Sequence, residues 1–190
     1  PVPTQGRYAN ETWPPVARDL AASSTEVLDS HVGRLLRHLD ALGAADNTLV
    51  LFTSDNGPEV TTTIHMREDH QHDGARPWRG MKRDNWEGGH RVPLIVRWPG
   101  TVKPNSTTDQ LASLTDLMAT CASIVGARLP DDSAEDSFNL HPTLTGRVTA
   151  VPIRPYLLQQ TISLGLSIRQ GRWKLLDHKG SGGNNYQRNK

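Results

Sequence analysis

A short apolar segment that runs into an Asp-Asn-Gly turn constrains the fold of this chain more than any other feature. Residues 49–53 have the composition of a buried strand, and Asp55, Asn56 and Gly57 follow almost at once. A second apolar segment, residues 93–98, comes after a polar, glycine-rich loop that holds Lys82. Open α/β sheets bind their ligands just beyond the carboxyl ends of strands. This order predicts that Asp55 and Lys82 lie at the same edge of one sheet.

The residue types at this edge indicate chemistry on an anionic ester. The carboxylate of Asp55 and the amide oxygen of Asn56 are hard ligands that suit Ca²⁺ or Mg²⁺. The ammonium group of Lys82 is a compact cation that pairs with sulfate or phosphate oxygens. Taken singly, the motifs have simpler interpretations. Asp-Asn-Gly is a good turn sequence, and Lys82 also fits a solvated basic loop.

Residues 59–77 form a long polar segment with no helical or strand periodicity, so we predict a loop, and loops of this length are often functional. Four possible metal ligands fall within it: His65, His70, His72 and Asp73. Zinc sites take such residues, but no strand pattern puts His70 and His72 on one face. We therefore predict a substrate-facing or solvated loop and keep zinc as the minor alternative.

Hydrophobic periodicity predicts an α/β region followed by a small antiparallel region. The predicted helices are residues 16–42, 111–125 and 140–146, and the predicted strands are residues 48–53, 93–98, 156–160, 164–169 and 173–176. Gly43 is predicted to end the first helix, and Gln170 and Gly171 to form a two-residue hairpin loop. Residues 177–190 are polar and glycine-rich, with no predicted element. A boundary near Arg147 divides the chain into residues 1–147 and 148–190.

Composition excludes several classes of protein. The chain has 190 residues, with 21 Lys and Arg against 20 Asp and Glu, so its net charge of +1 gives no general attraction to nucleic acid or anionic membranes. No segment approaches the roughly 20 apolar residues that span a bilayer. The single cysteine, Cys121, excludes an internal disulfide, and we predict a small buried residue in a helix. The chain begins at Pro1 without an initiator Met, which suggests a processed or truncated protein.

The combination of motifs is far more specific than its parts. The matching segments are DNTLVLFTSDNG at residues 46–57, RGMK at 79–82, WEGGHRVP at 86–93, IVRWPG at 95–100, SLTDLM at 113–118 and IRQGRWKL at 168–175. In this order they resemble the type I sulfatases, the arylsulfatase-like enzymes of the alkaline phosphatase superfamily. The resemblance runs over nearly the whole chain. It implies an alkaline-phosphatase-like α/β sandwich, with residues 1–147 in its core and residues 148–190 in a small C-terminal antiparallel subdomain.

The resemblance also implies a site. In that family the residues matching Asp55 and Asn56 bind Ca²⁺, and the residue matching Lys82 binds the sulfate group and serves catalysis. The nucleophile is a formylglycine made from Cys or Ser in a Cys/Ser-x-Pro/Ala-x-Arg motif. The implied reaction is hydrolysis of a sulfate monoester, and the implied partner is a sulfated small molecule or a sulfated glycan. Family members are largely exported or lysosomal, so the resemblance suggests a periplasmic, extracellular or lysosomal location.

The chain departs from the family pattern at the nucleophile. It contains no Cys/Ser-x-Pro/Ala-x-Arg motif, and Cys121 matches a helix position instead. The N-terminal Asp-Asp metal pair and a catalytic His are also missing. We therefore expect a C-terminal portion of a sulfatase with negligible turnover alone, unpaired sheet edges and low solubility. Two alternatives stay open: a phosphodiesterase or phosphonate hydrolase of the same superfamily, and a non-catalytic module that binds sulfated glycans.

Overall fold

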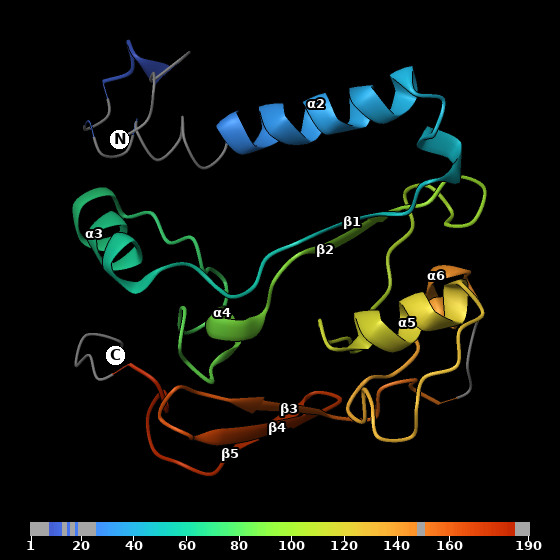
Figure 1. Cartoon of the computed structure of the whole chain (residues 1–190). Coiled ribbons are helices and arrows are strands. Elements are labelled where there is room, and N and C mark those ends of the chain that lie inside the picture. Colours follow the sequence, from blue (N-terminus) through green and yellow to red (C-terminus); the bar gives the residue numbers. More distant parts are fainter. Residues whose placement is uncertain (1–7, 13–14, 16–17, 19–25, 148–150, 185–190) are drawn as a thin grey trace. The chain divides into compact units, whose positions relative to one another are not determined.

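The computed structural model describes residues 8–12, 15, 18, 26–147 and 151–184, which belong to two compact units, residues 1–49 and 50–190 (Figure 1). In the first unit, helix α2 (Leu28–Ala41) precedes a short 3₁₀ helix, η3 (Ala45–Asn47). Apolar residues recur along α2 at helical spacing. Gly43 follows its last turn with φ +64°, so the predicted helix end is confirmed. Much of the predicted helix before residue 26 lies outside the described residues.

Two strands form the sheet next to the predicted site. Strand β1 (Val50–Thr53) pairs antiparallel with β2 (Leu94–Arg97), with Val50 opposite Arg97 and Thr53 opposite Leu94. Both strands were predicted from their apolar runs. Because the pair is antiparallel, the end of β1 and the beginning of β2 meet at the same end of the sheet. The turn that holds Asp55 and the loop that holds Lys82 are attached there.

The prediction of a loop over residues 59–77 is wrong for its first half. Residues Val60–His70 form helix α3, and the carboxylate of Glu59 caps its first turn by accepting a hydrogen bond from the Val60 amide at 3.0 Å. The helix has almost no apolar face, so periodicity could not reveal it. A capping carboxylate supplies part of the stabilisation that a buried face would otherwise provide.

The remaining helices are short. Helix α4 (Glu87–His90) is a single turn before β2, α5 (Asp116–Ile124) is shorter at its start than predicted, and α6 (His141–Leu144) follows an acidic segment. Cys121 on α5 is exposed, so its predicted burial is wrong. The side of α5 that is buried carries Asp116 and Thr120 instead.

Three strands between residues 157 and 176 form an antiparallel sheet, as predicted. Its strands are β3 (Leu157–Gln160), β4 (Leu166–Gln170) and β5 (Trp173–Leu176), in that order. Gln170 pairs with Trp173, so the two-residue hairpin loop is Gly171 and Arg172, one residue later than predicted. Gly171 has φ +54°, which suits the first loop position of such a hairpin.

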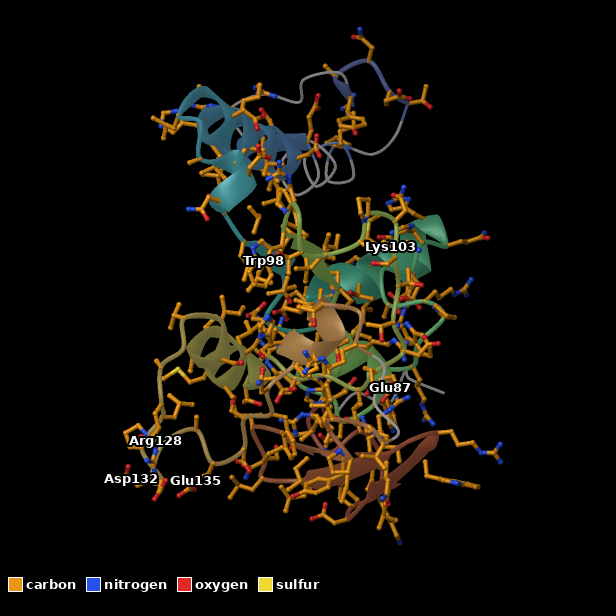
Figure 2. The ribbon with its side chains drawn as sticks, turned by 90° about the vertical axis from the view of Figure 1, so that its right-hand side faces the viewer. Glu87, Trp98, Lys103, Arg128, Asp132 and Glu135 are labelled. Carbon is orange, nitrogen blue, oxygen red and sulfur yellow. The ribbon has the colours of Figure 1, made fainter. Side chains whose placement is uncertain are left out.

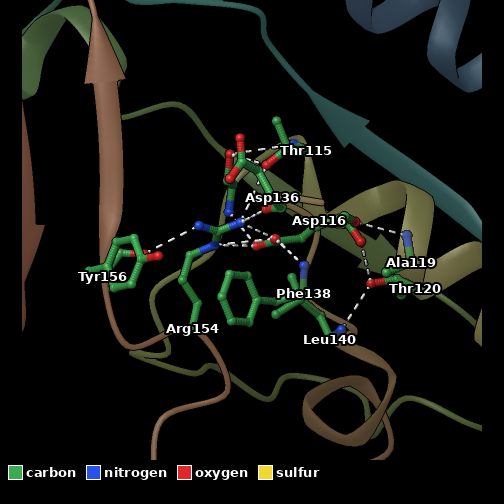
Figure 3. Close-up of polar contacts among 11 residues, drawn as sticks. Thr115, Asp116, Ala119, Thr120, Asp136, Phe138, Leu140, Arg154 and Tyr156 are labelled. Atoms are coloured by element: carbon green, nitrogen blue, oxygen red, sulfur yellow. Dashed lines mark hydrogen bonds and ion pairs between the residues drawn. The ribbon is translucent and has the colours of Figure 1, made fainter. Parts of the chain in front are cut away.

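Polar groups form much of the buried interior of the second unit. Among the described residues, the largest fully buried side chains are those of Met81, Asn85, Asp84 and Asp116. Asp116 bonds to the guanidinium of Arg154, which is 4% exposed, and accepts hydrogen bonds from the Ser113 and Phe138 amides at 2.8 and 2.9 Å (Figure 3). Arg154 therefore connects the start of the C-terminal region to α5.

The same cluster extends through the backbone around α5. The Arg154 guanidinium donates to the Asp136 carbonyl at 2.6 Å and lies over the Phe138 ring at 4.5 Å (Figure 3). The Thr120 hydroxyl donates to the Asp116 carbonyl and accepts from the Leu140 amide. The acidic segment at residues 130–137, for which no element was predicted, is thus anchored at its C-terminal end. Within the described residues, no helix has the length and apolar character needed to cross a membrane.

Candidate metal and anion site

The turn after β1 is hydrogen-bonded to both of the segments that the sequence singled out. The Gly57 amide donates to the Gly89 carbonyl at 3.0 Å, and the Lys82 amide donates to the Pro58 carbonyl at 3.0 Å. The Gly88 amide in turn donates to the Arg79 carbonyl at 2.7 Å. The backbones of the Asp55 turn, of residues 78–86 (called here the Lys82 loop) and of α4 are therefore in direct contact.

Glycine is required at this contact because the backbones approach closely. A Cβ atom on Gly57 would lie 1.7 Å from the Gly88 carbonyl oxygen, and one on Gly88 would lie 2.2 Å from the Gly80 carbonyl oxygen. Two arginines of these segments stack on tryptophans, Arg79 on Trp86 at 3.7 Å and Arg91 on Trp78 at 4.0 Å. The motif residues thus pack against one another across separate segments.

Asp55 lines a cavity of about 590 Å³, together with Glu87, His90, Arg91 and Arg169. Its carboxylate is exposed, and the Ser54 hydroxyl donates to it at 3.4 Å. The side-chain amide nitrogen of Asn56 donates to the Gly57 carbonyl at 3.1 Å, which leaves the side-chain amide oxygen available to a cation. Asp55 and Asn56 therefore offer two adjacent hard oxygen ligands.

These two ligands fit Ca²⁺ in kind but fall short in number. Ca²⁺ takes six to eight oxygen ligands. In the part of the chain that the structure describes, no group of three or more His, Cys, Asp and Glu residues is placed to hold a metal ion. Further ligands would be water, backbone carbonyls, other side-chain oxygens or groups beyond the described residues.

Lys82 lies beside the turn but is held by Glu59. Its ammonium nitrogen is 3.4 Å from the Glu59 carboxylate, and Arg83 donates to the same carboxylate at 2.9 Å. The hydrogen bond from Arg83 lowers the pKa of Glu59 most, although burial opposes it. Lys82 is not among the residues lining the cavity. The predicted proximity therefore holds for the backbones, and the Lys82 side chain points to the start of α3.

Glu87, the first residue of α4, forms ion pairs with the C-terminal sheet (Figure 2). Its carboxylate pairs with Arg169 on β4, with Lys174 on β5 at 3.2 Å and with Arg91 at 3.6 Å. Burial raises the pKa of Glu87, but the attraction of Lys174 and Arg169 outweighs it and lowers that pKa overall. Glu87 was singled out only as part of the WEGGHRVP motif at residues 86–93. Its ion pairs with the sheet were not predicted, because the partners lie far away in sequence.

His90 should make stability depend on pH just below neutrality. Burial lowers its pKa most and nearby Lys174 lowers it further, against the opposing carboxylates of Glu87 and Asp84. Since the unfolded state then binds the proton more readily, the free energy of unfolding falls as pH drops below about 6.5. We expect His90→Gln to flatten this slope in urea unfolding between pH 5 and 7, while His38→Gln, on the exposed side of α2, keeps it. Equal slopes in both variants would contradict this assignment.

The histidine segment does not come together as a cluster. Asp73 pairs with Arg67 at 2.7 Å and accepts a hydrogen bond from the Ala75 amide, while His65 lies 3.9 Å from Asp69 on the same helix. Sequence reasoning also missed the buried pair Asp84 and Asn85. In the sequence they are two polar residues between the Lys82 and Glu87 motifs, and such a pattern does not distinguish a buried pair from an ordinary exposed loop.

Comparison with known proteins identifies the family. Residues 4–127 match the Sulfatase family model. Over 153 residues the chain is 37% identical to an N-acetylgalactosamine-6-O-sulfatase of Bacteroides thetaiotaomicron, covering 79% of this chain and 29% of that protein. Over 126 residues it is 42% identical to the steryl-sulfatase of Rattus norvegicus, covering 66% and 22%. The chain belongs to the sulfatase family.

Solved structures agree on the fold. The PsFucS1 sulfatase from Pseudoalteromonas sp. superposes with a TM-score of 0.67 at 31% identity, over 84% of this chain and 30% of that one. Ps i-CgsB, solved with k-i-k-neocarrahexaose, superposes with a TM-score of 0.72 at 26% identity, over 90% and 36%. The α/β fold class predicted from the motifs is confirmed. The chain spans 20–29% of the length of the curated relatives that it matches.

Proposed function

We propose that this chain supplies the calcium-binding turn and the sulfate-binding lysine of an enzyme that hydrolyses sulfate monoesters. The observation that carries the proposal is the pair of hydrogen bonds that join the Asp55 turn to the α4 turn and to the Lys82 loop. They bring two hard oxygen ligands and one basic loop to the same end of the β1–β2 sheet. Membership of the sulfatase family favours sulfate over phosphate as the group transferred.

Asp55 and Asn56 would hold the Ca²⁺ ion, whose charge stabilises negative oxygens on the reacting group. Lys82 would contact a sulfate oxygen after leaving Glu59, and Arg83 would then remain as the partner of that carboxylate. Glu59 therefore holds the lysine near the turn in the absence of substrate. Because no formylglycine motif is present, the isolated chain should show negligible turnover of an aryl sulfate. Sustained turnover by the chain alone would overturn this assignment.

Calcium binding provides a direct test of the proposed ligands. We expect Ca²⁺ to shift the amide signals of Asp55 and Asn56 in ¹H–¹⁵N spectra, with a dissociation constant on the order of 10⁻³ M given so few protein ligands. Asp55→Ala should weaken binding by at least about tenfold, since it removes the only charged ligand of the pair. The matched control is Asp109→Ala, which removes another carboxylate from the same cavity. A larger loss in the control than in Asp55→Ala would show that the metal ligands are misassigned.

The substrate class follows from the same proposal. We infer a sulfated small molecule or sulfated glycan as the partner, and an exported or lysosomal setting for the whole enzyme. A sulfated saccharide that still binds after chelation, and in the double variant Asp55→Ala with Lys82→Ala, would favour a non-catalytic binding module instead. The division of the chain near Arg147 into a core portion and a C-terminal subdomain belongs to this proposal too.

A further inference from the structure

The glycine-rich segment after β5, residues 178–184, is packed against the Lys82 loop. A Cβ atom on Gly183 would lie 1.6 Å from the Arg83 carbonyl oxygen, and one on Gly182 would lie 2.3 Å from the His178 ring. The Gly182 carbonyl accepts a hydrogen bond from the Thr161 hydroxyl at 2.6 Å. The backbone contact at Gly183 leaves no room for a side chain. The segment is thus closely packed against the backbone of the Lys82 loop.

Asn184 makes the contact that bears most directly on the proposed site. Its side-chain amide donates to the Lys82 carbonyl at 2.6 Å and to the Asp84 carboxylate at 2.9 Å. Asp84 is fully buried, and its second oxygen accepts from the Met81 amide at 2.9 Å. The Lys82 carbonyl and the amide of the preceding residue, Met81, are thereby tied to one buried polar network.

Asn85 supplies a second attachment. Its backbone amide donates to the Ser181 carbonyl at 2.8 Å. Its side-chain amide bonds to the Gly165 carbonyl and to the His178 ring, both at 2.9 Å. The Ser181 hydroxyl donates to the Asn184 carbonyl at 2.9 Å, which joins the two attachments. On the opposite side, the Lys82 amide donates to the Pro58 carbonyl. The backbone of Lys82 is therefore fixed between the turn after β1 and the C-terminal segment.

We propose that residues 178–184 clamp the Lys82 loop and that Asn184 is a positioning residue for the sulfate-binding lysine. This inference rests on the function proposed for Lys82. A lysine side chain is long and flexible, so the only geometry that the protein can fix in advance is where its backbone begins. Asn184 fixes that origin, because it is the residue that bonds both the Lys82 carbonyl and the carboxylate that holds Met81.

The test uses the whole 190-residue chain labelled with ¹⁵N-lysine and titrated with sodium sulfate at constant ionic strength. The Lys82 amide signal is assigned by its absence in Lys82→Ala. We expect Asn184→Ala to weaken the sulfate response of that signal by about fivefold, the effect of one ordinary hydrogen bond. Hydrogen exchange at the Met81 amide, followed in a second sample labelled with ¹⁵N-methionine, should become faster by a similar factor, because Asp84 loses the side-chain hydrogen bond from Asn184. The matched control, Asn139→Ala, removes a side chain that caps the His141 amide and should change neither quantity.

The outcomes separate the two proposals. Sulfate binding to Lys82→Ala is measured by the rise in melting temperature that sulfate causes. Binding equal to that of the wild type overturns the proposed function and the positioning role with it. Weaker binding in Lys82→Ala beside unchanged binding in Asn184→Ala overturns the positioning role alone. If Asn184→Ala does not fold, Gly183→Ala replaces it, since its added carbon forces the segment away from Arg83. Sulfate affinity that survives this change likewise overturns the clamp.

Discussion

Replacing Arg154 by methionine should lower the free energy of unfolding by about 3–5 kcal/mol. The change leaves the fully buried Asp116 carboxylate without its cationic partner, and the two backbone amides that remain cannot replace the charge (Figure 3). The Asp136 carbonyl also loses its donor. Urea unfolding at pH 7, followed by tryptophan fluorescence, measures the loss.

The chain offers a matched control for this prediction. Arg128 pairs with Asp131 at 3.8 Å, but both side chains are about nine-tenths exposed. Arg128→Met should therefore change stability by less than about 0.5 kcal/mol. A loss in Arg154→Met no larger than that in Arg128→Met would show that the buried pair does not hold the C-terminal region to α5.

A double variant distinguishes the lost ion pair from lost packing. Asp116→Leu combined with Arg154→Met removes both charges and should recover part of the stability lost in Arg154→Met. If the double variant is instead as unstable as the sum of the two single changes, the hydrogen bonds around α5 are the main source of stability.

Replacing Gly57 by alanine should be the second most damaging change, with a cost of about 1–3 kcal/mol or more. The added carbon would lie 1.7 Å from the Gly88 carbonyl oxygen and 2.8 Å from its carbon, both of which are backbone atoms. The Asp55 turn must then separate from α4, which breaks the hydrogen bond from Gly57 to Gly89. We expect calcium binding to weaken together with stability.

Gly74→Ala is the control for this steric argument. A Cβ atom on Gly74 would meet only the side chain of Pro58, at an ordinary van der Waals distance of 3.8 Å. It should leave unfolding and the calcium titration close to wild type. If Gly57→Ala and Gly74→Ala have the same free energy of unfolding, the turn and α4 separate without cost. The contact between them would then not define the site.

The site was predictable in outline because its parts are local. Asp55, Asn56 and Gly57 follow an apolar strand directly, and Lys82 stands in a glycine-rich loop before the next strand. The sequence also predicted each strand of the described residues to within a few residues, since apolar runs bounded by turn residues are strong signals. It failed at α3, where no apolar face exists and a single capping carboxylate begins the helix.

The contacts that fix the site were decided only in three dimensions. Sequence alone determined which residues are candidates for the site, because strand ends, turn glycines and charged types are local properties. It could not show that Asn184 reaches Lys82 across about a hundred residues, that Glu87 meets strands β4 and β5, or that Arg154 is buried on Asp116. Such pairs depend on desolvation and exact partner geometry, and burial is what makes an ordinary polar residue essential.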